Sequence, residues 1–304
     1  MKIKVNQSEL ICNLKYIKCC DYVHSYTEWI DNGTEMKPFE DNSIFDKIKL
    51  DERKCISVYV KHGHPLRDFF KLIEGIDKKI ILITGSSDFS VTKKIYEFKP
   101  NNIIKWYAEN VDFECDNLIA LPAGSLSATW LGNSKEDSEL YNHANFKLVE
   151  TDNIEPKIKN LAFMCFNINT NLEHRTEVYN HFDNKMWVTN LSEMKTGERL
   201  DDDLFMENVF SHHFVISPYG NGIDCGRTWM TIQLGSIPVM QYHYCFKEWA
   251  KKLPIVLYDN INDVTEEYLL NKLKEFKNKD YNYELLKISY WKNKFESDKI
   301  YYSV

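Results

Sequence analysis

The feature that most constrains the fold of this chain is a glycine-rich turn that follows a short apolar segment. Phe214–Ile216 has the composition of a buried strand, and Gly220–Gly222 then allows a tight loop whose backbone can approach a ligand closely. Residues 225–234 have the pattern of a helix, with Asp224 as its expected N-cap. Residues 237–240 begin the next strand. The pattern predicts a strand, turn, helix and strand of an α/β fold.

The start of this predicted helix is suited to binding an anion. Its first N–H groups have no partner within the helix, and they form the positive end of the helix dipole. Arg227 lies in the first turn, where its guanidinium could bind a phosphate through two nitrogens. A surface ion pair explains Arg227 equally well on spacing alone, because a single glycine-rich turn is a weak signal.

Apolar segments alternate with helical patterns along most of the chain. The expected strands are residues 55–60, 79–84, 103–108, 118–122, 161–166, 186–189, 214–216, 237–240 and 254–257. This alternation predicts parallel sheets, and the length of 304 residues allows two domains. A polar stretch at 132–158 is the expected linker. We predict two Rossmann-like α/β domains facing a cleft, a reduced one at 1–152 and a second at 153–304.

A second loop of the same kind is expected after the strand at 161–166. It covers Asn167–Asn171 and leads into a helix that carries Arg175. In an open parallel sheet, ligands bind beyond the carboxyl ends of the strands. Two arginines and two helix starts around one crevice would suit a pyrophosphate, although a surface ion pair is again an alternative for Arg175.

The full string around the glycine-rich turn is more specific than its spacing. It resembles the signature SPxGNGxDxxRxWExLxxGxIPI of exostosin-like glycosyltransferases, especially the small soluble forms of large DNA viruses. The matching residues are Ser217, Pro218, Gly220, Asn221, Gly222, Asp224, Arg227, Trp229, Leu234, Gly235, Ile237 and Pro238. A second family pattern, NxxTNxxxR, is matched by Asn167, Thr170, Asn171 and Arg175. Weaker similarity occurs at residues 106–110 and 121–124.

The resemblance implies the GT-B arrangement, with an acceptor-side N-terminal domain and a C-terminal domain that binds the donor. The donor would be a nucleotide sugar, expected to be linked to UDP, and the acceptor a glycan or glycoprotein hydroxyl. Transfer with inversion and without a metal is expected. The implied donor site consists of Thr170, Asn171, Arg175, Ser217, Gly220, Asn221, Gly222, Asp224, Arg227 and position 230.

Position 230 departs from the family pattern. The family has Glu there, expected to accept hydrogen bonds from ribose hydroxyls, whereas this chain has Met230, whose thioether is a weak acceptor. The departure leaves open a nucleotide-sugar-binding protein with lost or weak catalysis. A third reading, a nucleotide-dependent oxidoreductase, is disfavoured because the chain has no G-x-G-x-x-G followed by an acidic residue about twenty positions later.

The expected catalytic base lies in the first half of the chain. Asp88 follows the strongly apolar segment 79–84, at the edge where parallel strands end. Its alternative role is to cap the next helix. Asp112 and Glu114 are further carboxylates near strand ends.

Composition excludes other classes of partner. The formal net charge of −7 argues against nucleic acid as the main partner. No run approaches the roughly 18 apolar residues of a membrane span, and the first residues lack the apolar core of a signal peptide. We therefore expect a cytoplasmic location, in the host if the chain is viral. No histidine pair has zinc-site spacing, and we predict no cofactor and no metal site.

Overall fold

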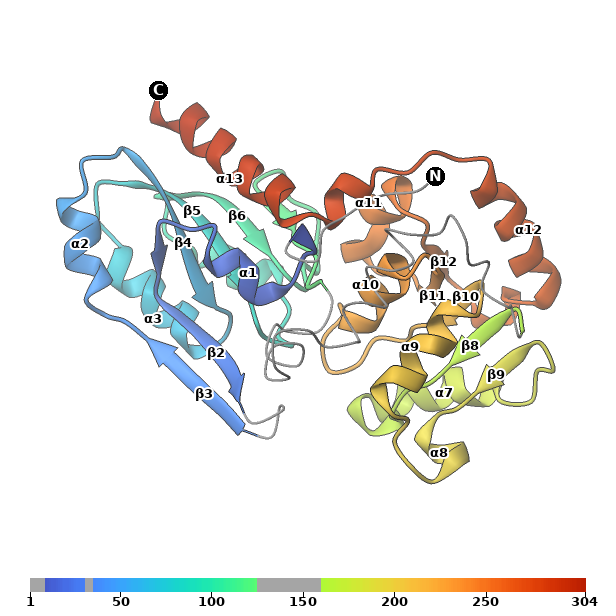
Figure 1. The fold of residues 1–304 in the computed structure, drawn as a ribbon. Helices are drawn as coiled ribbons and strands as arrows, with labels where there is room; N and C mark the ends of the chain where they lie inside the picture. The colour runs from blue at the N-terminus through green and yellow to red at the C-terminus, as the bar shows by residue number, and fades with distance from the viewer. Residues whose placement is uncertain (1–8, 31–34, 125–159) are drawn as a thin grey trace. The chain divides into compact units, whose positions relative to one another are not determined.

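The computed structural model describes residues 9–30, 35–124 and 160–304. These residues divide into two compact α/β units (Figure 1). The N-terminal unit contains residues 9–30, 35–124 and 284–304, and the C-terminal unit contains residues 160–283. Each unit has a five-stranded parallel sheet of its own, so the predicted pair of Rossmann-like domains is confirmed. The expected linker at 132–158 lies largely outside the described residues.

The sheet of the N-terminal unit has its strands in the order of the chain. The order is β1-β4-β5-β6-β7, and every neighbouring pair is parallel. The strands are β1 (Tyr22–Val23), β4 (Cys55–Lys61), β5 (Lys79–Gly85), β6 (Ile103–Ala108) and β7 (Leu118–Ala120). An antiparallel hairpin of β2 (Ser25–Ile30) and β3 (Glu35–Glu40) precedes β4. Because the strand order never reverses, this sheet has no topological switch point among its described strands.

Short helices connect these strands. They are α1 (Asn13–Ile17), α2 (Ile44–Leu50), α3 (His64–Ile73) and α4 (Lys93–Glu97). In α3 the buried side chains are Leu66, Phe69, Phe70 and Ile73, which form one apolar face at helical spacing. The N-cap of α4 is Thr92, whose hydroxyl accepts a hydrogen bond from the Ile95 amide. The alternative role of Asp88 as the cap of this helix is therefore wrong.

The last helix of the chain belongs to the N-terminal unit, which differs from the predicted division at residue 153. After the short 3-10 helix η5 (Tyr283–Leu286), helix α13 (Ile288–Ser303) packs on β4 and β5. Phe295 is fully buried, with its ring centroid 4.8 Å from that of Tyr107. Asp298 pairs with Lys105 at 3.0 Å and also accepts a hydrogen bond from the Tyr107 hydroxyl. These partners explain why a helix with polar residues on several faces attaches to this sheet.

The sheet of the C-terminal unit changes direction once. Its order is β12-β11-β10-β8-β9, again with all neighbouring pairs parallel. The strands are β8 (Ala162–Met164), β9 (Val188–Asn190), β10 (Phe214–Ile216), β11 (Ile237–Gln241) and β12 (Val256–Tyr258). The first strand, β8, has the second on one side and the third on the other. This is the flavodoxin-like order, in which the switch point lies between the first and third strands.

Helices connect the strands of the C-terminal sheet. They are α7 (Leu172–Phe182), α8 (Glu193–Thr196), α9 (Asp202–Phe210), α10 (Gly226–Gln233), α11 (Tyr244–Lys252) and α12 (Glu266–Lys277), with the 3-10 helices η3 (Ile168–Thr170) and η4 (Ile261–Asp263). The core between α7 and the sheet contains Val178, Phe182, Phe214 and Ile216. Within the described part of the chain, no helix is both long and apolar enough to span a bilayer.

Candidate functional site

The loops after β8 and β10 meet at the switch point of the C-terminal sheet. Because β8 and β10 are adjacent and parallel, their carboxyl ends lie side by side. The chain leaves β8 toward β9 and leaves β10 toward β11, so the two loops diverge at the place where open parallel sheets bind ligands. These are the two loops in which the sequence places the donor site, at 167–171 and 217–224.

Arg175 joins the two loops. It lies in α7, is 5 % exposed, and donates hydrogen bonds to three backbone carbonyls. Nε donates to Tyr219 O at 2.9 Å, Nη1 to Asn167 O at 2.6 Å, and Nη2 to Pro218 O at 3.3 Å. Burial, and then the charge of Arg227, lowers the pKa of Arg175 to about 10. The side chain is thus a buried cation that holds the two loops together. It is not the exposed ion-pair partner that the sequence spacing left open as an alternative.

Arg227 comes to the same place from the other loop. It lies in the first turn of α10 and is half-buried, with Nη1 3.4 Å from Pro218 O. Its Nε is buried without a hydrogen-bond partner among the described residues. Both guanidinium groups lie over the ring of Phe166, each with its central carbon 5.7 Å from the ring centroid. Cation–π contacts to this one ring offset part of the repulsion between the two like charges.

Neither arginine has an acidic partner in the described part of the chain. The ion pairs found there involve other residues, and the bonds of both guanidinium groups go to neutral carbonyls. Two adjacent, partly desolvated cations repel each other and lose hydration. A bound anion would relieve both costs, so the arginine pair is suited to binding one.

Gly220 is required by the close approach of Arg175. A Cβ atom at Gly220 would lie 2.8 Å from Arg175 Nη2 and 3.4 Å from Thr170 Oγ1. Asn171 fixes the same loop, because its Nδ2 donates to Gly220 O at 3.1 Å while its Oδ1 caps α7 by accepting from the His174 amide. The structure therefore brings together Thr170, Asn171, Arg175 and Gly220, as predicted.

His174 is a member of the site that sequence reasoning missed. Its ring stacks on Tyr219 with centroids 3.9 Å apart and an interplanar angle of 10°. Burial, and then the charge of Arg175, lowers the pKa of His174 to about 4, so the ring is neutral at pH 7. The stack adds a second link between α7 and the glycine-rich loop. The sequence contained a signal for this stack, because Tyr219 follows Ser-Pro in the glycine-rich loop and His174 directly precedes Arg175.

The predicted N-cap at Asp224 is wrong. Helix α10 begins at Gly226 with Cys225 as N-cap, and the Cys225 side chain makes no capping hydrogen bond. Asp224 Oδ1 instead accepts a hydrogen bond from Trp229 Nε1 at 2.7 Å. The carboxylate is 8 % exposed and holds the loop against the helix. The start of α10 thus lacks a side-chain cap, which leaves its amides suited to an anion.

Other predicted donor residues lie at different depths. Ser217 is fully buried, and its hydroxyl is 3.0 Å from that of Thr228, so its contacts are internal. Asn221 is exposed and Gly222 is buried, with Gly222 O accepting from the Gly220 amide. Met230 is 8 % exposed. Gln233, one turn further along α10, is buried and its Nε2 has no partner among the described residues.

The carboxyl edge of the N-terminal sheet contains two carboxylates of interest. Asp88 is exposed in the loop after β5. Glu109, directly after β6, is 5 % exposed, and its Oε2 accepts from the Ser86 amide at 3.0 Å. Ser86 and Asn110 both have positive φ angles, of 56° and 53°, which is uncommon for residues other than glycine. A buried carboxylate surrounded by strained backbone at a strand end is a functional candidate that the sequence analysis did not select.

Asp112 and Glu114, the other carboxylates considered, are exposed. No cluster of three or more His, Cys, Asp or Glu side chains suited to a metal was found in the residues that the structure covers. The Asp-x-Asp spacing of metal-dependent sugar transferases occurs at Asp201–Asp203, at the start of α9. Metal independence therefore stays a prediction.

Comparison with known proteins gives limited similarity. No protein-family model and no curated protein matches the chain. Similar solved structures include an alpha1,3-fucosyltransferase (14 % identity, TM-score 0.45, covering 80 % of this chain and 77 % of that one). Another is the enzyme with GDP-fucose (14 %, 0.40, 82 % and 91 %). A third is the enzyme with GDP (11 %, 0.45, 94 % and 95 %). The function of the site is therefore argued from its own residues.

Proposed function

We propose that the protein is a glycosyltransferase whose C-terminal unit binds the diphosphate of a nucleotide sugar. The observation that supports it best is the pair Arg175 and Arg227, two cations on one aromatic ring at the switch point, with no acidic partner among the described residues. The resemblance of residues 217–238 to exostosin-like glycosyltransferases favours a nucleotide sugar over other diphosphates.

In the proposed reaction, an acceptor hydroxyl oxygen attacks the anomeric carbon of the sugar. The bond from that carbon to the phosphate oxygen breaks, and the diphosphate leaves with an added negative charge. Arg227 and the uncapped start of α10 would stabilise this charge, while Arg175 would hold both loops in place. A single displacement of this kind inverts the anomeric centre.

A carboxylate of the N-terminal unit would accept the proton of the acceptor hydroxyl. Asp88 is the base that we propose, because it is exposed at the carboxyl edge of its sheet. Glu109 is the second candidate, favoured by its burial and by the strained residues around it. The acceptor is proposed to be a glycan or glycoprotein.

We propose UDP as the donor nucleotide, on the strength of the sequence resemblance. The test is a thermal-shift panel of UDP, GDP, CMP and their sugar conjugates against the intact protein. A UDP-sugar should raise the unfolding temperature most, and more than the free sugar. A larger shift with a GDP-sugar would support the diphosphate site but identify guanine, and not uracil, as the base of the donor nucleotide. No shift with any nucleotide would contradict the proposal.

A nucleotide-sugar-binding protein without catalysis is the competing function, and Met230 is the observation that favours it. Its nearly buried thioether offers a ribose little hydrogen bonding. Release of free sugar from the best donor of the panel, measured with and without mixed glycan acceptors, separates the two functions. A bound donor that is neither hydrolysed nor transferred would establish the binding protein.

A further inference from the structure

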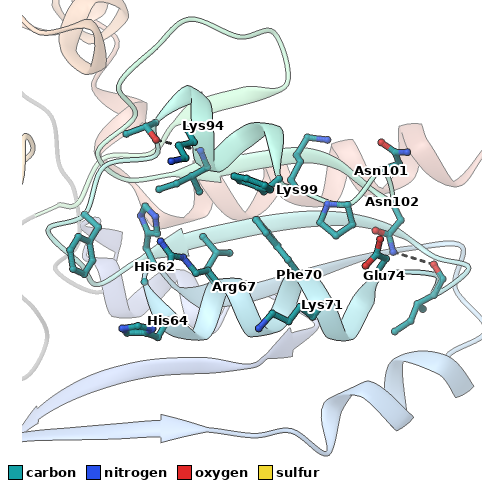
Figure 2. Close-up of a pocket in the computed structure, with 18 of the residues that line it drawn as sticks. His62, His64, Arg67, Phe70, Lys71, Glu74, Lys94, Lys99, Asn101 and Asn102 are labelled. Atoms are coloured by element: carbon teal, nitrogen blue, oxygen red, sulfur yellow. Dashed lines mark hydrogen bonds between the residues drawn. The ribbon is translucent and has the colours of Figure 1, made fainter.

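A groove in the N-terminal unit is lined by none of the residues proposed above for the donor site or as the base. It has a volume of about 1360 Å³ and runs between α3 and the segment that contains α4 (Figure 2). One end lies near His62, directly after β4, and the other near Glu74 and Asn102, beyond the end of α3 (Figure 2). The ten residues of α3 give it a length of about 15 Å.

The floor of the groove is apolar. Leu66 and Phe70 form part of it from the buried face of α3, and Ile95 contributes from α4. Phe89 and Phe98, which also line it, are 66 % and 72 % exposed. Large aromatic rings exposed beside an apolar groove indicate a surface that a ligand covers, because water contact with them is unfavourable.

The two lining cations that have no partner among the described residues lie toward the His62 end of the groove. Arg67, in the first turns of α3, and Lys94, at the start of α4, both line the groove (Figure 2). Neither has an ion-pair or hydrogen-bond partner among the described residues, whereas Lys71 pairs with Asp68 at 3.1 Å. Burial lowers the pKa of His62 to about 4, so this ring adds no charge at pH 7. The acidic lining residues, Glu74 and Asp77, come after α3, at the opposite end.

We propose that this groove binds an anionic amphiphile, a ligand with one linear apolar chain and an anionic headgroup. The headgroup would pair with Arg67 and Lys94, and the chain would cover Leu66, Phe70 and Phe98. The unpaired cations set the place of the headgroup, because the other lining lysines, Lys71 and Lys99, already have partners and the carboxylates come after α3. The chain has a net charge of −7, so two cations without ion-pair partners among the described residues, beside exposed aromatic rings, differ from its overall acidic character. Binding of an anion would explain them.

The site is independent of the proposed nucleotide site, because its lining residues all belong to the N-terminal unit. Its test is a calorimetric titration of the intact protein with dodecyl phosphate and with dodecanoate, below the concentrations at which they form micelles. We expect saturable binding of one molecule. The ligand that binds more tightly shows whether the site prefers a phosphate or a carboxylate headgroup.

Two comparison ligands separate the parts of the proposal. Dodecyl maltoside has the chain without the charge, and butyl phosphate has the charge with a short chain. Each should bind at least tenfold more weakly than dodecyl phosphate. Dodecyl maltoside lacks the charge that pairs with the cations, and butyl phosphate lacks methylenes that each contribute about fourfold to affinity when buried. Equal binding of dodecyl maltoside would overturn the role of the cations, and absence of binding by both dodecyl anions would overturn the site.

Variants test the residues directly. Arg67→Ala combined with Lys94→Ala should weaken dodecyl phosphate at least tenfold, and Lys93→Ala, an exposed lysine of α4 outside the groove, should not. Phe98→Ser should weaken it severalfold, whereas Leu72→Ser, on α3 but outside the groove, should not. All five positions are exposed, so unfolding temperatures should stay near that of the wild type. Unchanged binding in the double variant would contradict the proposal.

Discussion

Arg175 Nη2 lies 2.8 Å from the position that a Cβ atom would take on Gly220. The guanidinium thus occupies the space that a side chain at residue 220 would need, and from there it donates hydrogen bonds to the carbonyls of Pro218 and Tyr219. The glycine of the turn and the arginine of the helix are two halves of one arrangement, although 45 residues separate them in the chain.

Gly220→Ala should therefore disturb both stability and nucleotide binding. The added methyl group must displace a buried guanidinium held by three hydrogen bonds, a kind of overpacking that costs about 1–3 kcal/mol. Urea unfolding and UDP titration measure the two effects. Asn221→Ala, at the exposed neighbouring position, is the matched control and should leave stability unchanged. Wild-type behaviour of Gly220→Ala would show that Arg175 moves freely.

The pKa of His174 predicts a loss of stability in acid. It is about 4 in the folded protein and near 6.5 when the chain is unfolded, so the unfolded state binds more protons between these values. Stability should be complete above pH 6.5 and fall as pH drops toward 4. His174→Phe should keep the stacking on Tyr219 and reduce this fall by about 3 kcal/mol at pH 4. His62, with a similar pKa, would remain as the internal reference. An unchanged pH profile in His174→Phe would refute the assignment.

The attachment of α13 to the N-terminal sheet predicts a large effect at Asp298. Its removal leaves the ammonium of Lys105 largely buried and without its carboxylate, a change that typically costs about 3–5 kcal/mol. Chemical denaturation of Asp298→Ala measures this cost. Asp280→Ala removes the same charge from an exposed loop and should have little effect. Similar midpoints for the two variants would mean that α13 contributes little to the fold.

Two carboxylates compete for the role of base. Asp88→Asn should lower turnover by about 10²–10⁴-fold while the dissociation constant of the donor stays the same. Glu109→Gln retains the acceptor for the Ser86 amide, so it tests the charge without removing the hydrogen bond. Wild-type turnover in Asp88→Asn, together with a loss in Glu109→Gln, would transfer the role to Glu109.

Sequence reasoning was most successful where structure depends on neighbouring residues. Thr265, a residue type that favours the N-cap, caps α12, and Gly235 follows the end of α10 with a positive φ of 77°. The glycine-rich loop and Arg175 were placed at one edge because parallel strands put their carboxyl ends together. The parts that failed depend on specific contacts between side chains. Asp224 does not cap α10, because the indole of Trp229 takes its carboxylate.

Two further features could not be read from the chain for the same reason. The sheet to which α13 attaches is decided by partners such as Lys105 and Tyr107, nearly two hundred residues earlier. The burial of Glu109 depends on how Gly85 and Ser86 fold against it, since a Cβ at Gly85 would lie 2.4 Å from Glu109 Oε1. Local pattern gives no sign of such an approach.

The central claim, an anion site formed by the two arginines, is tested most directly by calorimetric titration of Arg227→Ala with UDP. Arg227 has a buried Nε without a partner in the described structure and one long bond to a carbonyl, so its loss should cost little stability. A charge-assisted pair to phosphate predicts a loss of roughly 2–5 kcal/mol in binding, about 30-fold or more in Kd. Lys185→Ala, an exposed cation before β9, is the charge control and should bind as the wild type does. A Kd for Arg227→Ala equal to that of the wild type would contradict the claim.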